Sequence, residues 1–201
     1  MTRYPIAHDA AAGPEISALF ADLDTNLRLL LAGAAGCSPY LKGIMLKDAG
    51  WLRDMLSGAP EAGIIAATQA LDVLAGDALA PALRKAKRRI ALTVALADLG
   101  GIWPLETVTG VLTDFADHAV ALGLKALIAD EIRRGKLPGA EAADAATGAG
   151  MVVLAMGKMG AGELNYSSDI DLICLFDETR YPGCEQEARA SFIREIGRAH
   201  V

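Results

Sequence analysis

The sequence predicts a mainly helical region followed by the first strands of an α/β domain. Apolar residues recur at three- and four-residue steps through most of the first 138 positions, which is the period of an amphipathic helix. Short apolar runs, partly β-branched, then occur at 151–156 and 170–176, as expected of buried strands. Two strands are too few for a complete sheet. We therefore expect the second domain to be incomplete.

The composition is that of a folded globular protein and excludes several functional classes. Of the 201 residues, 53% are hydrophobic and 22% charged, and the net charge is −6. This charge argues against a general nucleic-acid or membrane-surface binder. The sequence shows neither a signal-peptide layout nor an apolar run long enough to span a membrane. Its three cysteines and three histidines have no zinc-ligand spacing. We expect a cytoplasmic protein without nucleic-acid or membrane partners.

Helices are predicted throughout the first region. The apolar period over 14–32 predicts one helix. Ser38 and Pro39 are residue types favoured at the N-cap and first helical position, so a second helix should begin there. Further helices are expected over 47–57, 60–74 and 79–99 and from 105 to about 134. Gly135 and Pro138 follow the last of these, which is the usual chemistry of a helix end.

Two further segments do not follow from the helical pattern alone. Residues 84–89, RKAKRR, are expected to be a solvated flank whose side chains meet nearby acids. The functional alternative is a surface for a phosphate group or an acidic partner. Residues 139–150 are small and lack an apolar period. We expect a linker or loosely packed loop there, between a helical region at 1–138 and the α/β domain at 151–194.

Two aspartates stand at the beginning of the second predicted strand, within MGKMGAGELNYSSDIDLICLFD at 156–177. Alternate side chains of a strand share a face. Asp169 and Asp171 should therefore point the same way, with Ile170 on the buried face. Adjacent carboxylates repel each other unless a cation lies between them. Their hard oxygen atoms suit Mg²⁺, with Mn²⁺ as an alternative.

The glycine-rich turn before these aspartates is a candidate phosphate site. Gly157, Gly160 and Gly162 would let backbone amides approach an anion, and Lys158 adds a positive charge. The spacing matches neither the dinucleotide-binding fingerprint nor the P-loop. Taken singly, each feature fits a rim strand after an ordinary turn. Together, a strand, a glycine-rich turn, an S-D-x-D sequence and a strand within about 25 residues are typical of polymerase-β-type nucleotidyltransferases.

A longer resemblance includes this motif. GKMGAGELNYSSDIDLI resembles the signature G-K-[LM]-G-x-x-E-L-x-[YF]-x-S-D-[IL]-D-L of the bifunctional glutamine synthetase adenylyltransferase/adenylyl-removing enzymes. ALADLGGIWPLETVTGVLTDFAD is similar to the helical segment that precedes that signature. The resemblance covers roughly residues 75–194. It implies a mainly helical region followed by the first strands of an incomplete polymerase-β-type nucleotidyltransferase domain.

The longer chains of this family carry two such domains. The N-terminal domain removes AMP from glutamine synthetase, and the C-terminal domain adds it. The segment ELNYSSDIDLI and a start methionine about 150 residues before the motif match the N-terminal copy better. The alternative is the adenylyl-adding copy.

The resemblance also implies site residues and partners. Asp169 and Asp171 would be the catalytic, metal-binding pair. Ser168 and the turn from Gly157 to Gly162 would lie near the nucleotide phosphates. The expected reaction is phosphorolysis, in which phosphate takes AMP from a tyrosine and ADP is released. The implied partners are glutamine synthetase, a PII nitrogen-signal protein, ATP or ADP, and phosphate. The signature includes Glu163, Asn165 and Tyr166 without indicating their roles.

The family's third metal-binding carboxylate lies in a later E-V-D-x-R-L-R-P segment, which this sequence does not contain. We therefore expect the 201 residues to be inactive by themselves. One alternative is a non-catalytic binding module for glutamine synthetase or a PII protein.

The last seven residues, EIGRAHV, depart from the family-like pattern. Residues 196–201 can be written in codons as ATC GGA AGA GCA CAC GTC, which is one frame of a widely used sequencing adapter. We expect 195–201 to be non-native read-through, with an ordinary amphipathic helix end as the alternative.

Overall fold

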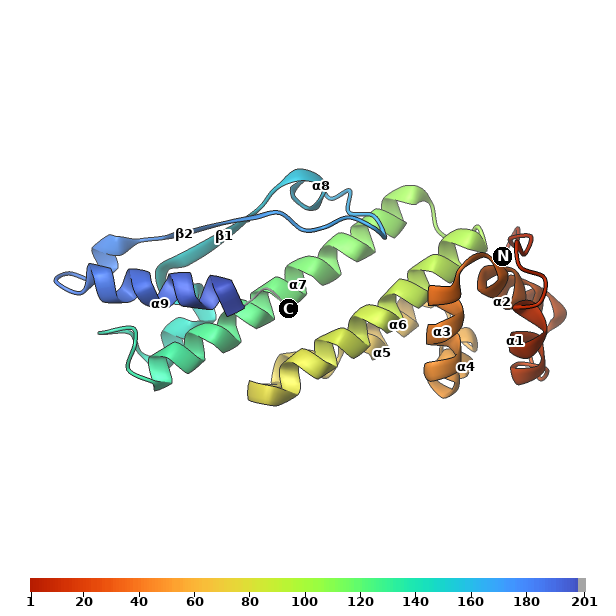
Figure 1. Ribbon diagram of the computed structural model, residues 1–201, viewed down its shortest axis with the longest axis horizontal. Coiled ribbons are helices and arrows are strands. Elements are labelled where there is room, and N and C mark those ends of the chain that lie inside the picture. The colour runs from red at the N-terminus through yellow and green to blue at the C-terminus, as the bar shows by residue number, and fades with distance from the viewer. Residues whose placement is uncertain (199–201) are drawn as a thin grey trace. The chain divides into compact units, whose positions relative to one another are not determined.

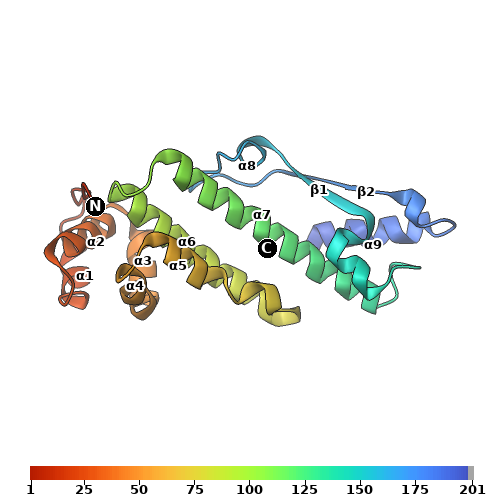
Figure 2. The ribbon, with the colours of Figure 1, turned by 180° about the vertical axis from the view of Figure 1, so that it is seen from behind.

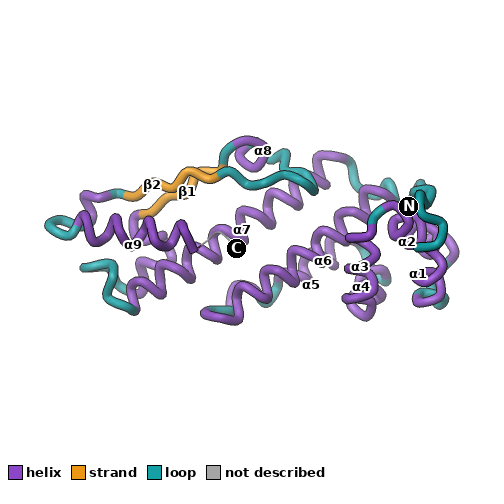
Figure 3. The backbone as a smooth tube through the Cα atoms, viewed as in Figure 1, coloured by secondary structure: helices purple, strands orange, loops and turns teal. Residues whose placement is uncertain are grey.

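The computed structural model describes residues 1–198 (Figure 1). These residues are mainly helical with two strands near the C-terminal end, as the sequence predicted (Figure 3). The two strands pair in an antiparallel sheet. The chain divides into two compact units. The helical unit comprises residues 1–70 and 82–112, and the ribbon unit comprises residues 71–81 and the chain from 113 onward. The domain limits expected from the sequence, at 138 and 150, stay a prediction.

The helical unit is built from several helices (Figure 2), and their buried apolar side chains form a core. Its elements are α1 (Gly13–Leu19), α2 (Thr25–Cys37), α3 (Pro39–Lys47), α4 (Ala49–Leu56), α5 (Pro60–Thr68) and most of α6 (Leu79–Leu99). α3 begins as predicted: the Ser38 hydroxyl accepts a hydrogen bond from the backbone N–H of Leu41 at 3.2 Å. The buried side chains of the core include Phe20, Leu31 and Leu92. No helix among the described residues is long and apolar enough to cross a membrane.

Two helices are shorter than predicted. The single helix expected over 14–32 is interrupted between α1 and α2. The Asp24 carboxylate accepts hydrogen bonds from the backbone N–H groups of Asn26 and Leu27. An N-cap of this kind starts a new helix although the apolar period is continuous. The helix expected over 60–74 ends at Thr68 and is followed by the 3₁₀ helices η1 (Leu71–Val73) and η2 (Gly76–Ala78).

The basic cluster on α6 takes part in the fold. Arg88 and Arg89 form ion pairs with Asp48, at 3.8 and 3.3 Å. The Arg89 guanidinium also lies 4.9 Å from the ring centre of Trp51. These contacts agree with the expectation that the cluster meets nearby acids.

The ribbon unit combines the second part of α7 (Leu105–Arg133) with the strands β1 (Met151–Ala155) and β2 (Leu172–Phe176). It also contains η3 (Ala142–Gly150), α8 (Gly157–Gly160), η4 (Glu178–Arg180) and α9 (Glu185–Arg198). The expectation of a loosely packed loop at 139–150 was wrong for η3. Ala145 and Ala149 of this element are buried, because their small side chains fit the core between α7 and α9.

The strands are covered on one face only. Met151 pairs with Phe176 and Ala155 with Leu172 in an antiparallel register. One face packs on a core that includes α9 (Figure 1). The side chains of the other face are between 43% and 54% exposed: Val152, Leu154, Ile173 and Leu175. The prediction that both strands are buried was therefore wrong, because the described helices cover only one face of the pair.

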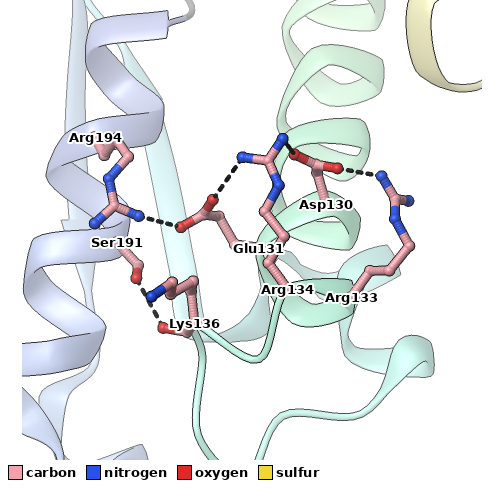
Figure 4. A network of polar contacts seen from close by, with 7 residues as sticks. All are labelled: Asp130, Glu131, Arg133, Arg134, Lys136, Ser191 and Arg194. Atoms are coloured by element: carbon pink, nitrogen blue, oxygen red, sulfur yellow. Dashed lines mark hydrogen bonds and ion pairs between the residues drawn. The ribbon is translucent and has the colours of Figure 1, made fainter.

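Ionic contacts join α9 to the end of α7 (Figure 4). Glu131 is fully buried, and its carboxylate lies 2.8 Å from Arg194 Nη1 and 3.6 Å from Arg134 Nη1. Nearby, the Ser191 hydroxyl donates to the backbone carbonyl of Lys136 at 2.7 Å. Loss of one partner of a buried charge is costly, because the remaining charge stays out of water. This network therefore ties α9 firmly to α7.

Tyr181 connects η4 to the same core. Its ring lies 5.9 Å from that of Phe192, and its hydroxyl donates to the carbonyl of Ala149 at 2.5 Å. Ala149 has a positive φ of 50°, which is unusual for a residue with a side chain. Burial raises the pKa of Tyr181, so its phenol stays protonated and able to donate.

Residues 195–198 continue α9, and 199–201 lie outside the described residues. The proposed read-through at 195–201 stays a prediction.

Replacing Tyr181 by Phe should lower the free energy of unfolding by about 1–3 kcal/mol, because the buried carbonyl of Ala149 loses its donor. The matched control is Tyr40→Phe, since Tyr40 is exposed and its change should stay within about 0.5 kcal/mol. Urea denaturation of both variants measures the difference. Equal effects of the two substitutions would show that the hydroxyl of Tyr181 does not stabilise the fold.

Candidate functional site

The predicted site residues lie on the connection from β1 to β2, which includes α8 (Figures 1 and 3). The backbone N–H of Met156 donates to the carbonyl of Asp171 at 2.8 Å. This bond extends the strand pairing by one residue pair, to Met156 and Asp171, which are the first and last residues of the connection. It therefore brings Met156, the residue just before the glycine-rich turn, next to the second aspartate.

The backbone conformation and close packing of the turn explain why glycine occurs at these positions. Gly157 and Gly162 have positive φ values of 57° and 73°, a conformation that glycine adopts at little cost. A Cβ added at Gly160 would lie 2.4 Å from the carbonyl oxygen of Ala155, so no side chain fits there. A Cβ added at Gly157 would lie 3.7 Å from Asp171 Oδ2. The Asp171 carboxylate therefore lies beside the turn.

The two aspartates occupy different backbone settings. Both are exposed, and β2 begins only at Leu172. Asp171 is joined to the strand pair through its carbonyl, whereas Asp169 precedes it. The alternation of a strand therefore does not fix the direction of Asp169, and a shared direction stays a prediction. Ile170 is 42% exposed, so its expected place on a buried face was wrong, because that part of the connection has no covering layer among the described residues.

A hydrogen-bonded turn centred on Asn165 leads into Asp169. Its side-chain oxygen accepts from the N–H of Ser167 at 3.1 Å and from the hydroxyl of Ser168 at 2.7 Å. The preceding residue, Leu164, is buried, and its N–H donates to Thr113 Oγ1 of α7 at 3.2 Å. Sequence inspection missed Thr113, because no local signal connects two residues so far apart in the chain.

The oxygen atoms present have the chemistry of a magnesium site. Asp169 and Asp171 supply carboxylates, and Ser168 supplies a hydroxyl. Mg²⁺ is commonly bound through one or two carboxylates, with water and substrate phosphate completing its shell. No group of three His, Cys, Asp or Glu side chains in the described part of the chain is placed to hold a metal. The residues fit a partial ligand set that depends on substrate or on further protein ligands.

Lys158 is not brought into contact with the aspartates. Its side chain is exposed, and among residues 1–198 the ion pairs do not include Lys158, Asp169 or Asp171. Its carbonyl accepts from the N–H of Glu163 at 2.7 Å, which closes the glycine-rich turn. The predicted group is thus assembled in part: Asp171 with Gly157, and Ser168 with Asn165.

Comparison with known proteins gives a consistent result. The family model described as glutamate-ammonia ligase adenylyltransferase matches residues 29–198. Similar relatives are bifunctional glutamine synthetase adenylyltransferase/adenylyl-removing enzymes. That of Bradyrhizobium sp. strain BTAi1 is 45% identical over 75% of this chain, and that of Rhodopseudomonas palustris strain BisB5 is 44% identical over 78%. That of Xanthobacter autotrophicus is 40% identical over 84%.

The chain spans only 16% to 18% of the length of these three relatives. No solved structure matches it.

Replacing Gly160 by Ala should lower the free energy of unfolding by at least about 1–3 kcal/mol, because the new methyl group would overlap the Ala155 carbonyl. Gly43→Ala is the matched control. Gly43 lies inside α3 with open space around its Cα, so its change should be neutral or stabilise by up to about 1 kcal/mol. Thermal and urea denaturation compare the two variants. A Gly160→Ala chain as stable as the Gly43→Ala chain would contradict the close approach.

Proposed function

Because the chain belongs to the glutamate-ammonia ligase adenylyltransferase family, we propose that it is part of an enzyme that removes AMP from an adenylylated tyrosine of glutamine synthetase. The observation that carries this proposal is the Met156–Asp171 hydrogen bond, which sets an aspartate of the S-D-x-D motif beside the glycine-rich turn. The names of the relatives support the enzyme class and the protein substrate. The partner half of the full enzyme would add AMP from ATP.

In this proposal Asp169 and Asp171 are catalytic and hold Mg²⁺, with Mn²⁺ as the alternative. A divalent ion in such a site neutralises negative charge that develops on the reacting phosphoryl group. Lys158 and the glycines at 157, 160 and 162 bind the nucleotide phosphates through charge and backbone amides. An oxygen of inorganic phosphate forms a bond to the phosphorus of AMP while the bond to the tyrosine oxygen breaks. The tyrosine oxygen takes up a proton, and ADP is released.

The motif sequence ELNYSSDIDLI supports assignment to the adenylyl-removing copy of the domain. The adenylyl-adding copy is the alternative, and it would use the same residues on ATP. We further propose a PII nitrogen-signal protein as the regulatory partner and the cytoplasm as the location.

A second candidate function is a non-catalytic module that binds glutamine synthetase or a PII protein. The observation that favours it is the absence of a third acidic ligand near the two aspartates within the described residues. It also leads us to propose that the 201 residues are inactive by themselves.

In the complete enzyme, Asp169→Asn and Asp171→Asn should each reduce phosphorolysis of adenylylated glutamine synthetase by about 10³-fold or more, because the metal loses a charged ligand. Both side chains are exposed, so the melting temperature should change little. Asp77→Asn is the matched control, since Asp77 is also exposed, and should keep normal turnover. Near-normal activity of folded Asp169 and Asp171 variants would remove the basis for the proposed site.

The isolated 201-residue chain should release no detectable ADP from adenylylated glutamine synthetase when phosphate and Mg²⁺ are present, because two carboxylates form an incomplete metal site. Nucleotide release followed by chromatography measures this. Steady turnover by the isolated chain would show that its own residues complete the site. Tight binding of glutamine synthetase without turnover, in both the isolated chain and the complete protein, would favour the binding module.

A further inference from the structure

The side-chain oxygen of Asn165 receives several hydrogen bonds from the next residues along the chain. It accepts from the backbone N–H of Ser167 at 3.1 Å and from the hydroxyl of Ser168 at 2.7 Å, and Ser167 Oγ lies 3.4 Å away. The backbone carbonyl of Asn165 also accepts from the N–H of Ser168 at 3.3 Å. Asn165 therefore determines the conformation of the two residues that precede Asp169.

The orientation of the Asn165 amide follows from these partners. A backbone N–H can only donate a hydrogen bond, so the atom that faces Ser167 N must be the carbonyl oxygen and not the NH₂ group. The same oxygen faces Ser168 Oγ at 2.7 Å. Because this oxygen can only accept, the hydroxyl of Ser168 must be the donor.

This arrangement limits what Ser168 can do in the site. A hydroxyl has one hydrogen to donate and two lone pairs. Its hydrogen is already used on Asn165, so a phosphate oxygen could receive it only after a short hydrogen bond had broken. What remains available is a neutral oxygen lone pair, which is a ligand suited to Mg²⁺ or Mn²⁺. The expectation that Ser168 contacts phosphate is therefore less consistent with this geometry than a contact with the cation.

We propose that Asn165 is a positioning residue, which directs the lone pairs of Ser168 to a divalent ion held by the neighbouring Asp169. The inference rests on the proposed function, since it requires that Asp169 binds a metal. It assigns a role to a residue of the motif for which the sequence indicated none.

The position of Asn165 is itself fixed by the ribbon unit. Leu164 is buried and bonded through its N–H to Thr113 of α7. An asparagine anchored in this way holds its oxygen in place, whereas one on a free loop would move with the serines. Outer-shell partners of this kind orient the ligands of a metal, and their loss typically costs about 10- to 100-fold in metal affinity.

The test is a Mn²⁺ titration of the complete enzyme and its variants, followed by water-proton relaxation, together with thermal unfolding of each variant. Asn165→Ala and Ser168→Ala should each weaken Mn²⁺ binding about tenfold. The double variant should be no weaker than either single one, because Asn165 acts through the Ser168 hydroxyl. Asn26→Ala, a change of an exposed asparagine elsewhere, should leave the affinity unchanged.

A rescue variant separates positioning from a general effect on the loop. Asn165→Asp keeps an accepting oxygen and should retain Mn²⁺ affinity. Adding Ser168→Ala to it should abolish this retention. If the added negative charge alone attracted the ion, the affinity would instead persist in the combined variant, and that result would overturn the proposal.

The remaining outcomes distinguish this inference from the proposed function. Binding that is lost in Asp169→Asn but normal in a folded Asn165→Ala chain would overturn the role of Asn165 alone. If Asn165→Ala does not fold, normal binding by Ser168→Ala would overturn it equally. Absence of Mn²⁺ binding in the unaltered complete enzyme, or binding that Asp169→Asn does not change, would overturn both the metal assignment and the inference.

Discussion

The antiparallel pairing of β1 with β2 is the constraint on which the candidate site depends. The two strands are separated by a connection that contains glycines, polar residues and a very short helix. By itself such a segment has little apolar surface to bury and would not hold one conformation. The pairing continues to Met156 and Asp171 and closes the connection at its base. The glycine-rich turn and the S-D-x-D sequence are adjacent in space for this reason.

The pairing is in turn supported by contacts at both ends of the ribbon unit. At the far end of the strands, Tyr181 donates to the carbonyl of Ala149, and Phe176 and Phe192 pack with ring centres 5.0 Å apart. The buried Glu131 carboxylate holds Arg194, so that α9 is joined to α7 beside this core. On the connection itself, Gly160 permits close contact with Ala155, and Leu164 is held to Thr113. Apolar packing and a few buried polar bonds thus position residues that are themselves exposed.

The uncovered face of the strand pair has a physical cost. Val152, Leu154, Ile173 and Leu175 place neighbouring apolar side chains in water. Apolar contact with a further layer would be favourable, in proportion to the area removed from water. The strands thus have the composition of a sheet covered on both faces, although the described residues cover one. This difference explains why a pattern that is apolar on both faces led to the wrong expectation of burial.

Local chemistry was sufficient to predict much of this protein from its sequence. The start of α3 at Ser38 and Pro39, the extent of α6, the end of α7 and the existence of both strands follow from capping residues and apolar period, which act within a few residues. The motif at 157–171 likewise identified the family, because its residue types and spacing are specific. A local signal failed where another local signal competed with it, as Asp24 did within the apolar period of 14–32. Only the tertiary structure decided which strand face is buried and which residue of α7 anchors the turn. These features depend on contacts between segments that are distant along the chain, and the spacing of residues in a sequence does not encode such contacts.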